Sequence, residues 1–67
     1  MKLLEIHTFE PYTLYINPAY ITAIESNTDS EGHLISLIHC SDKAPASIRR
    51  IRDKRQPDEV NLAISKL

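Results

Sequence analysis

The chain has 67 residues, the length of a single small domain (residues 1–67), and its net charge at pH 7 is −1. Its composition, 42% hydrophobic and 25% charged residues, excludes a disordered segment. Cys40 is the only cysteine, so an intrachain disulfide is excluded, and a lone thiol without an export signal predicts a cytoplasmic protein. No stretch approaches the ~18 apolar residues of a membrane span, so we expect none.

Small size limits the hydrophobic core of such a domain. A domain of about 60 residues buries only about 60% of the surface that its unfolded chain exposes. Domains in this range gain stability from disulfides, metals or self-association. Because a disulfide is excluded and no metal site is expected, we expect a homo-oligomer.

Two β-strands are predicted at the start of the chain. Residues 3–9 and 12–16 are rich in β-forming side chains and are separated only by Glu10-Pro11. Pro11 suits a turn, where its missing N–H is not needed. The two segments are therefore expected to form a hairpin.

A second pair of strands is predicted after Asn17-Pro18, which ends the first pair. Residues 20–26 and 33–40 are the next strands, and a turn of helix is compatible with Tyr20. The polar residues 27–32, which end in the only glycine, form the loop between these strands.

The segment 46–53 has two interpretations. Ile48 and Ile51 have a helical spacing, whereas Ile48, Arg50 and Arg52 would share one face of a strand. We favour a fifth strand, because it extends the preceding strands, and helix is the alternative.

A helix is predicted from Pro57 to the last residue, Leu67. Proline suits the first helical position, and Asp58 and Glu59 complement the positive end of the helix dipole. An apolar stripe follows at i, i+3, i+4 and i+7: Val60, Ala63, Ile64 and Leu67.

The predicted fold class is therefore α+β: an antiparallel β-meander of four to five strands with one C-terminal helix. The side chains expected in the core alternate along the strands or lie on the apolar face of the helix. They are Leu4, Ile6, Leu14, Ile16, Ile21, Ile24, Ile35, Leu37, Val60 and Ile64.

No catalytic or metal-binding motif is visible. The candidate metal ligands are His7, His33, His39 and Cys40, and the adjacent pair His39-Cys40 would point to opposite faces of a strand. A single glycine excludes the glycine-rich loops that bind phosphates. We therefore expect no catalytic residues, no metal, no cofactor and no small-molecule substrate, and we predict that the protein is not an enzyme.

Basic side chains are concentrated in one segment: Arg49, Arg50, Arg52, Lys54 and Arg55. This cluster is the candidate binding site. It could hold the phosphates of a nucleic acid. We favour a charged edge strand that opposes aggregation or pairs with the acidic first half of a neighbouring subunit.

The sequence resembles a known family in the block Tyr15-Ile16-Asn17-Pro18, followed by Tyr20-Ile21 and Ala23-Ile24-Glu25. This block is similar to the small FlbD/SwrD-type flagellar and swarming-motility proteins and to short phage proteins of unknown function. The resemblance implies a β-rich fold with a terminal helix, a bacterial or phage origin and no catalytic residues. The family's second hairpin turns on Asn-Gly, whereas residues 41–45 of this chain carry a different turn.

These observations predict a non-catalytic protein–protein interaction module that self-associates and binds another, unidentified protein. A small nucleic-acid-binding regulator that uses residues 49–55 is one alternative. A structural component of a phage or motility assembly is another.

Overall fold

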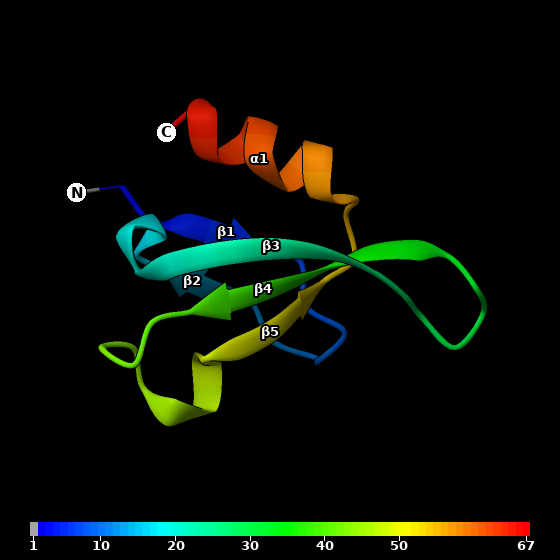
Figure 1. Cartoon of the computed structure of the whole chain (residues 1–67), viewed down its shortest axis with the longest axis horizontal. Coiled ribbons are helices and arrows are strands. Elements are labelled where there is room, and N and C mark those ends of the chain that lie inside the picture. The colour runs from blue at the N-terminus through cyan, green and yellow to red at the C-terminus, as the bar shows by residue number, and fades with distance from the viewer. Residues whose placement is uncertain (1) are drawn as a thin grey trace.

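The computed structural model describes residues 2–67, which form five β-strands, two turns of 3-10 helix and one α-helix (Figure 1). β1 (Leu4–Ile6) and β2 (Leu14–Ile16) form an antiparallel hairpin. β3 (Ile21–Thr28), β4 (Leu34–Cys40) and β5 (Arg50–Asp53) form a separate antiparallel sheet, with β4 between the other two. The helix α1 (Pro57–Ser65) follows β5. The predicted α+β class, the antiparallel strands and the C-terminal helix are confirmed.

The strands are divided between two sheets at Asn17. The Asn17 side chain accepts a hydrogen bond from the N–H of Ala19 at 3.0 Å, and residues Pro18–Tyr20 form a turn of 3-10 helix, η1. This turn leads the chain from the hairpin into the other sheet, so β2 and β3 are not paired. The turn of helix compatible with Tyr20 is confirmed.

The ambiguous segment 46–53 contains both predicted structures. Residues Ala46–Ile48 form a second turn of 3-10 helix, η2, and β5 then pairs with β4 along its whole length. The preferred strand is thus confirmed for Arg50–Asp53, whereas the helical alternative describes the residues before it. Ile48 packs against the core from the helical turn.

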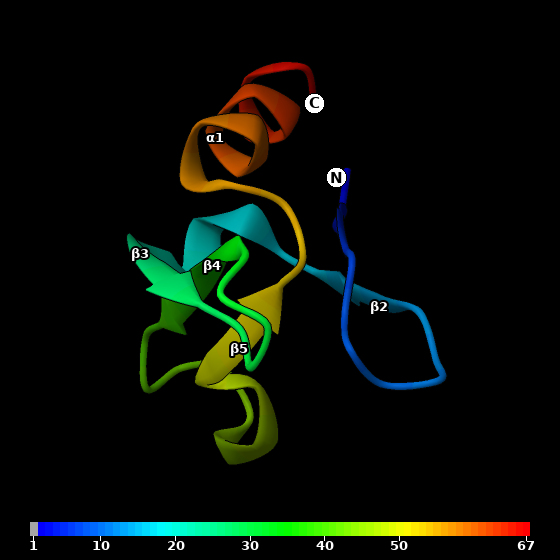
Figure 2. The same ribbon diagram turned by 90° about the vertical axis from the view of Figure 1, so that its right-hand side faces the viewer.

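The core lies between the hairpin, the β3–β4–β5 sheet and α1. Figure 2 shows the helix above the sheet and the hairpin beside it. The central cluster joins all three parts and consists of Leu4, Ile6, Ile16, Ile38, Ile51 and Val60. Four predicted core residues, Leu14, Ile21, Ile24 and Ile64, are partly buried against this cluster.

The prediction that Leu37 belongs to the core is wrong, because its neighbour Ile38 on β4 faces the core instead. Ile38 is fully buried and lies opposite Ile24 and Ile51, whereas Leu37 is only half-buried. Successive strand residues face opposite sides, so the burial of Ile38 turns Leu37 away from the core. Ile35 is buried as predicted, but it lies outside the central cluster.

A buried ion pair joins the hairpin to the sheet. The Asp53 carboxylate has no exposed surface and accepts hydrogen bonds from the main-chain N–H groups of His7 (3.1 Å) and Arg55 (2.8 Å). It also accepts from Nε and Nη2 of Arg55, at 3.0 and 2.8 Å. The same Nη2 donates to the carbonyl of Glu5, and the Ser36 hydroxyl donates to the carbonyl of Arg55, both at 2.8 Å.

Burial alone would raise the pKa of Asp53, because it disfavours the charged carboxylate. The hydrogen bonds from Arg55 and from the His7 N–H outweigh burial and lower the pKa below its usual value. A carboxyl group with a lower pKa in the folded than in the unfolded chain stabilises the fold above its unfolded pKa. That contribution is lost as the pH falls through the folded pKa.

We predict that Asp53→Asn lowers the free energy of unfolding by about 3 kcal/mol, because it leaves the partly buried Arg55 guanidinium without its counter-charge. Urea unfolding at pH 7, followed by circular dichroism, measures this difference. Asp42→Asn removes an exposed carboxylate and serves as the control, with an expected change within about 0.5 kcal/mol. Equal stabilities of Asp53→Asn and the unmodified protein would contradict the structural role of the pair.

The difference between these two proteins should depend on pH. We predict that it is largest at neutral pH and shrinks below about pH 4, the usual pKa of an aspartate, because Asp53 of the unfolded chain then takes up a proton. The loss is complete only at lower pH, where Asp53 of the folded protein is protonated as well. Urea unfolding repeated from pH 7 down to the acid range tests this. A difference that stays constant with pH would mean that the charge of Asp53 is not what stabilises the fold.

Candidate functional site

The basic cluster predicted from the sequence divides into two groups in the structure. Arg50 and Arg52 on β5 and Lys54 just beyond it are exposed, and their alternate spacing places them on one side of the chain. Arg49 and Arg55 direct their guanidinium groups to the protein itself. Only the first group offers its charges to a ligand in full.

Arg49 and Arg55 each hold a segment of main chain. Arg49 donates to the carbonyls of Asp42 (3.2 Å) and Ala44 (3.4 Å), and thereby braces the turn between β4 and η2. Arg55 is bound by Asp53, and these hydrogen bonds raise the pKa of its guanidinium. The sequence of the segment could not show that these two arginines bond to the protein itself, whereas Arg50, Arg52 and Lys54 are free to bind a ligand.

Two aromatic rings that the sequence did not connect with the basic segment lie beside it. Cζ of Arg52 and Nζ of Lys54 lie 5.2 and 5.6 Å from the centre of the Phe9 ring, within the range of cation–π attraction. Phe9 is 40% exposed and Tyr12 is 59% exposed. The sequence feature that could have indicated these rings is the position of one aromatic residue on each side of the Glu10-Pro11 turn.

The turn between β1 and β2 and the strand β5 enclose a groove of ≈ 390 Å³, which we call the basic groove. Its wall on one side carries Phe9 and Tyr12, and its wall on the other side carries Arg50 and Arg52. Glu10 also lines it. The basic groove therefore combines cations with accessible rings, and it contains a single carboxylate among the described lining residues.

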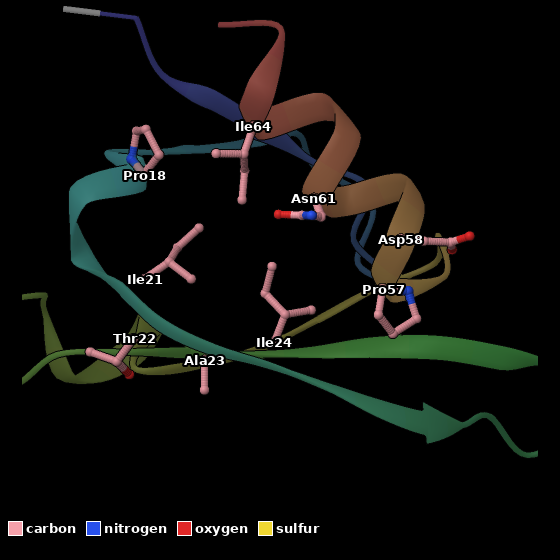
Figure 3. A pocket seen from close by; sticks show the side chains of 9 residues that line it. All are labelled: Pro18, Ile21, Thr22, Ala23, Ile24, Pro57, Asp58, Asn61 and Ile64. Carbon is pink, nitrogen blue, oxygen red and sulfur yellow. The ribbon is translucent and has the colours of Figure 1, made fainter.

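A second hollow, of ≈ 580 Å³, lies between β3 and α1 (Figure 3). Ile21 and Ile24 of β3 point toward the helix, and Ile64 points back toward the strand. Asn61 lies between them on the helix, and the three isoleucines are only partly buried. We call this hollow the β3–α1 groove; it is apolar at its centre and open to solvent.

The β3–α1 groove runs along an open edge of the sheet. β3 is paired with β4 on one side, and no strand among residues 2–67 pairs with its other side. β5, at the opposite edge, is joined to the hairpin only at its end, where the Lys54 N–H donates to the His7 carbonyl at 2.8 Å. Within residues 2–67, β3 is therefore the longer open edge of this sheet, with eight residues against the four of β5.

The hydrogen bonds of β4 determine which groups of β3 face this edge. The Cys40 N–H donates to Arg49 on the β5 side, at 2.8 Å, and the Ser41 N–H donates to Tyr20 on the β3 side, at 2.7 Å. Successive residues of an antiparallel strand direct their main-chain groups to alternate neighbours. The odd-numbered residues of β4 therefore bond to β3.

Ala23, Glu25 and Asn27 of β3 lie opposite odd-numbered residues of β4 and bond to it. Ile24 and Ser26 consequently direct their N–H and C=O groups away from β4, to the open edge. The eight residues of β3 contain no lysine, arginine or proline, which commonly protect an edge strand. The open edge therefore offers main-chain partners without a steric or positive-charge barrier.

The candidate metal ligands and the thiol have ordinary surroundings. His39 Nε2 lies 2.8 Å from the Glu25 carboxylate, and burial raises the pKa of the Cys40 thiol, which opposes formation of a nucleophilic thiolate. No group of three or more His, Cys, Asp or Glu side chains is placed to hold a metal ion within residues 2–67. The same residues include no helix that is long and apolar enough to cross a membrane.

Comparisons of the chain with protein-family models, with curated proteins and with solved structures found no match. The resemblance to the FlbD/SwrD-type proteins stays a prediction. The function must therefore be argued from the two grooves and the open edge.

Proposed function

We propose that this protein is a non-catalytic protein–protein interaction module that associates with a second copy of itself by strand addition at β3. The observation that carries the proposal is the open edge, where Ile24 and Ser26 present unpaired main-chain groups beside the apolar β3–α1 groove. Unpaired strand edges bind further strands through main-chain hydrogen bonds, and neighbouring pockets receive alternate side chains.

Charge on β3 limits how two copies can pair about a two-fold axis. A register centred on Glu25 places this carboxylate directly opposite the same residue of the second copy, and like charges facing each other are destabilising. A register centred on Ser26 brings the outward N–H of Thr28 to the interface. That N–H already donates to Oδ1 of Asn27, at 2.9 Å.

A register centred on Ile24 avoids both problems. The outward main-chain groups of Ile24 meet those of Ile24 in the second copy. Ser26 lies opposite Thr22, where an irregularity between Ile21 and Ala23 ends the regular alternation of β3. Glu25 then lies opposite the small side chain of Ala23. The two Glu25 side chains are then diagonal neighbours, about 7–8 Å apart, instead of directly opposite each other.

The same register continues the apolar contact from one copy to the other. The side chain of Ile24 points toward the helix, so the two copies of this residue meet on the α1 side of the joined sheet. The partly buried Ile21 and Ile64 lie next to this contact. Burial of further apolar surface stabilises a chain whose own core is small.

An extended segment of another protein would use the same edge and the same groove. Such a partner would compete with the second copy, because the open edge of one β3 binds one strand at a time. The proposal therefore includes both a homo-oligomer and an unidentified protein partner, on a single surface.

We predict that the protein is a dimer at micromolar concentration and that Ser26→Pro makes it a monomer. Proline removes the outward N–H of residue 26, whereas the bonds between β3 and β4 are made by the residues on either side. Light scattering and sedimentation measure the mass. Ser26→Ala loses the same hydroxyl but keeps the N–H, so it is the matched control and should stay dimeric.

Amide hydrogen exchange tests the same interface without a variant. Protection of the amides of Ile24 and Ser26 should rise with protein concentration, whereas the amide of Glu25, which bonds to β4, should be protected at every concentration. A monomer in light scattering, or a concentration-independent exchange pattern at Ile24 and Ser26, would overturn the proposal.

A further inference from the structure

We propose that the basic groove binds single-stranded nucleic acid, with Arg50 and Arg52 at the phosphates and Tyr12 stacked on a base. The basic groove lies at the β5 side of the sheet, whereas the open edge of β3 lies at the other side. The two surfaces are therefore separate, and this proposal goes beyond the association of two copies.

Three cations beside the basic groove have no carboxylate partner in the part of the chain that the structure describes. No salt bridge among residues 2–67 involves Arg50, Arg52 or Lys54, so these cations keep their charge available for an anion. Arg52 and Lys54 are placed by their contacts with the Phe9 ring. Cations aligned along one side of a strand match the repeated phosphates of an extended nucleic acid.

The turn between β1 and β2 places two accessible aromatic rings, Phe9 and Tyr12, at the basic groove. The Thr8 hydroxyl donates to the carbonyl of Tyr12 at 2.9 Å and lies 3.2 Å from the carbonyl of Glu10, which closes the turn that carries both rings. The main chain of Tyr12 is thereby fixed at the wall of the basic groove, and more than half of the residue's surface is exposed. Exposed rings beside cations are the stacking platforms of proteins that bind single strands.

The combination of groups favours a single-stranded nucleic acid over other anions. An acidic peptide supplies carboxylates for the arginines but no planar base for Tyr12. A duplex supplies phosphates, but its bases are stacked within the helix. Glu10, which also lines the basic groove, repels phosphate and can accept a hydrogen bond from a base N–H group, so the phosphates are expected on the arginine side.

Fluorescence anisotropy with labelled oligothymidylate and oligouridylate of about 12 nucleotides tests the proposal at low salt. We predict binding that weakens with salt, and a loss of roughly 5- to 100-fold on Tyr12→Ala with little change on Tyr12→Phe, which keeps the ring. The double variant Arg50→Ala/Arg52→Ala should lower the slope of log K against log salt concentration by about 1.4, or about 0.7 per phosphate.

A matched control removes the same number of charges elsewhere. Lys43→Ala/Lys66→Ala alters the turn after β4 and the end of α1, outside the lining of the basic groove, and should change the affinity by less than the arginine variant. Equal losses for the two double variants would overturn the proposal. So would no binding at low salt, equal affinity for a duplex of the same length, or tighter binding of a glutamate-rich peptide.

The two proposals fail in different ways. Ser26→Pro should bind a short oligonucleotide as the unmodified protein does, because β3 is remote from the basic groove in the strand order. A dimer that binds no oligonucleotide rejects the nucleic-acid site alone. A monomer that binds oligonucleotides with the predicted loss on Tyr12→Ala rejects self-association alone.

Discussion

The hydrogen-bonded pair of Asp53 and Arg55 is the interaction on which the rest of the structure depends. β1 and β2 are three residues long, and two such strands have few ladder bonds to hold a hairpin in place. The buried carboxylate reaches the His7 N–H, and the arginine that neutralises it reaches the Glu5 carbonyl. One ion pair thus attaches the middle of β1, and the residue that follows it, to the end of β5.

Both candidate surfaces follow from this attachment. Once β1 is held against the end of β5, the turn that follows β1 carries Phe9 and Tyr12 to the side of Arg50 and Arg52, which creates the basic groove. The same attachment covers the end of the β5 edge of the sheet. β3 is open along its whole outer side within residues 2–67, because the hairpin lies at the opposite edge of the sheet.

Turn and capping residues predicted where helices and strands begin and end. The burial of particular side chains depends on contacts between distant residues, and the sequence did not predict it. Pro57 and the acidic residues after it predicted the start of α1, and Asn17-Pro18 predicted the break after β2. Burial of Asp53 could not be predicted, because its partner at His7 is 46 residues away and is a main-chain group. The choice between Leu37 and Ile38 for the core likewise depends on pairing with β3 and β5, since both are apolar. For the candidate site, composition located the basic segment, but only tertiary contacts distinguish the exposed arginines from Arg49 and Arg55.

The two edges of the β3–β4–β5 sheet meet the same physical problem in different ways. An edge strand has unpaired N–H and C=O groups that attract other strands. At β5 the chain covers part of its own edge with the hairpin and lines the adjoining groove with cations, which repel a second copy of the same surface. At β3 neither device is present within residues 2–67, and an apolar groove lies beside the unpaired groups. Because the core of such a chain is small, a strand added at β3 would stabilise the fold in two ways. It would pair the unpaired main-chain groups and bury the apolar groove.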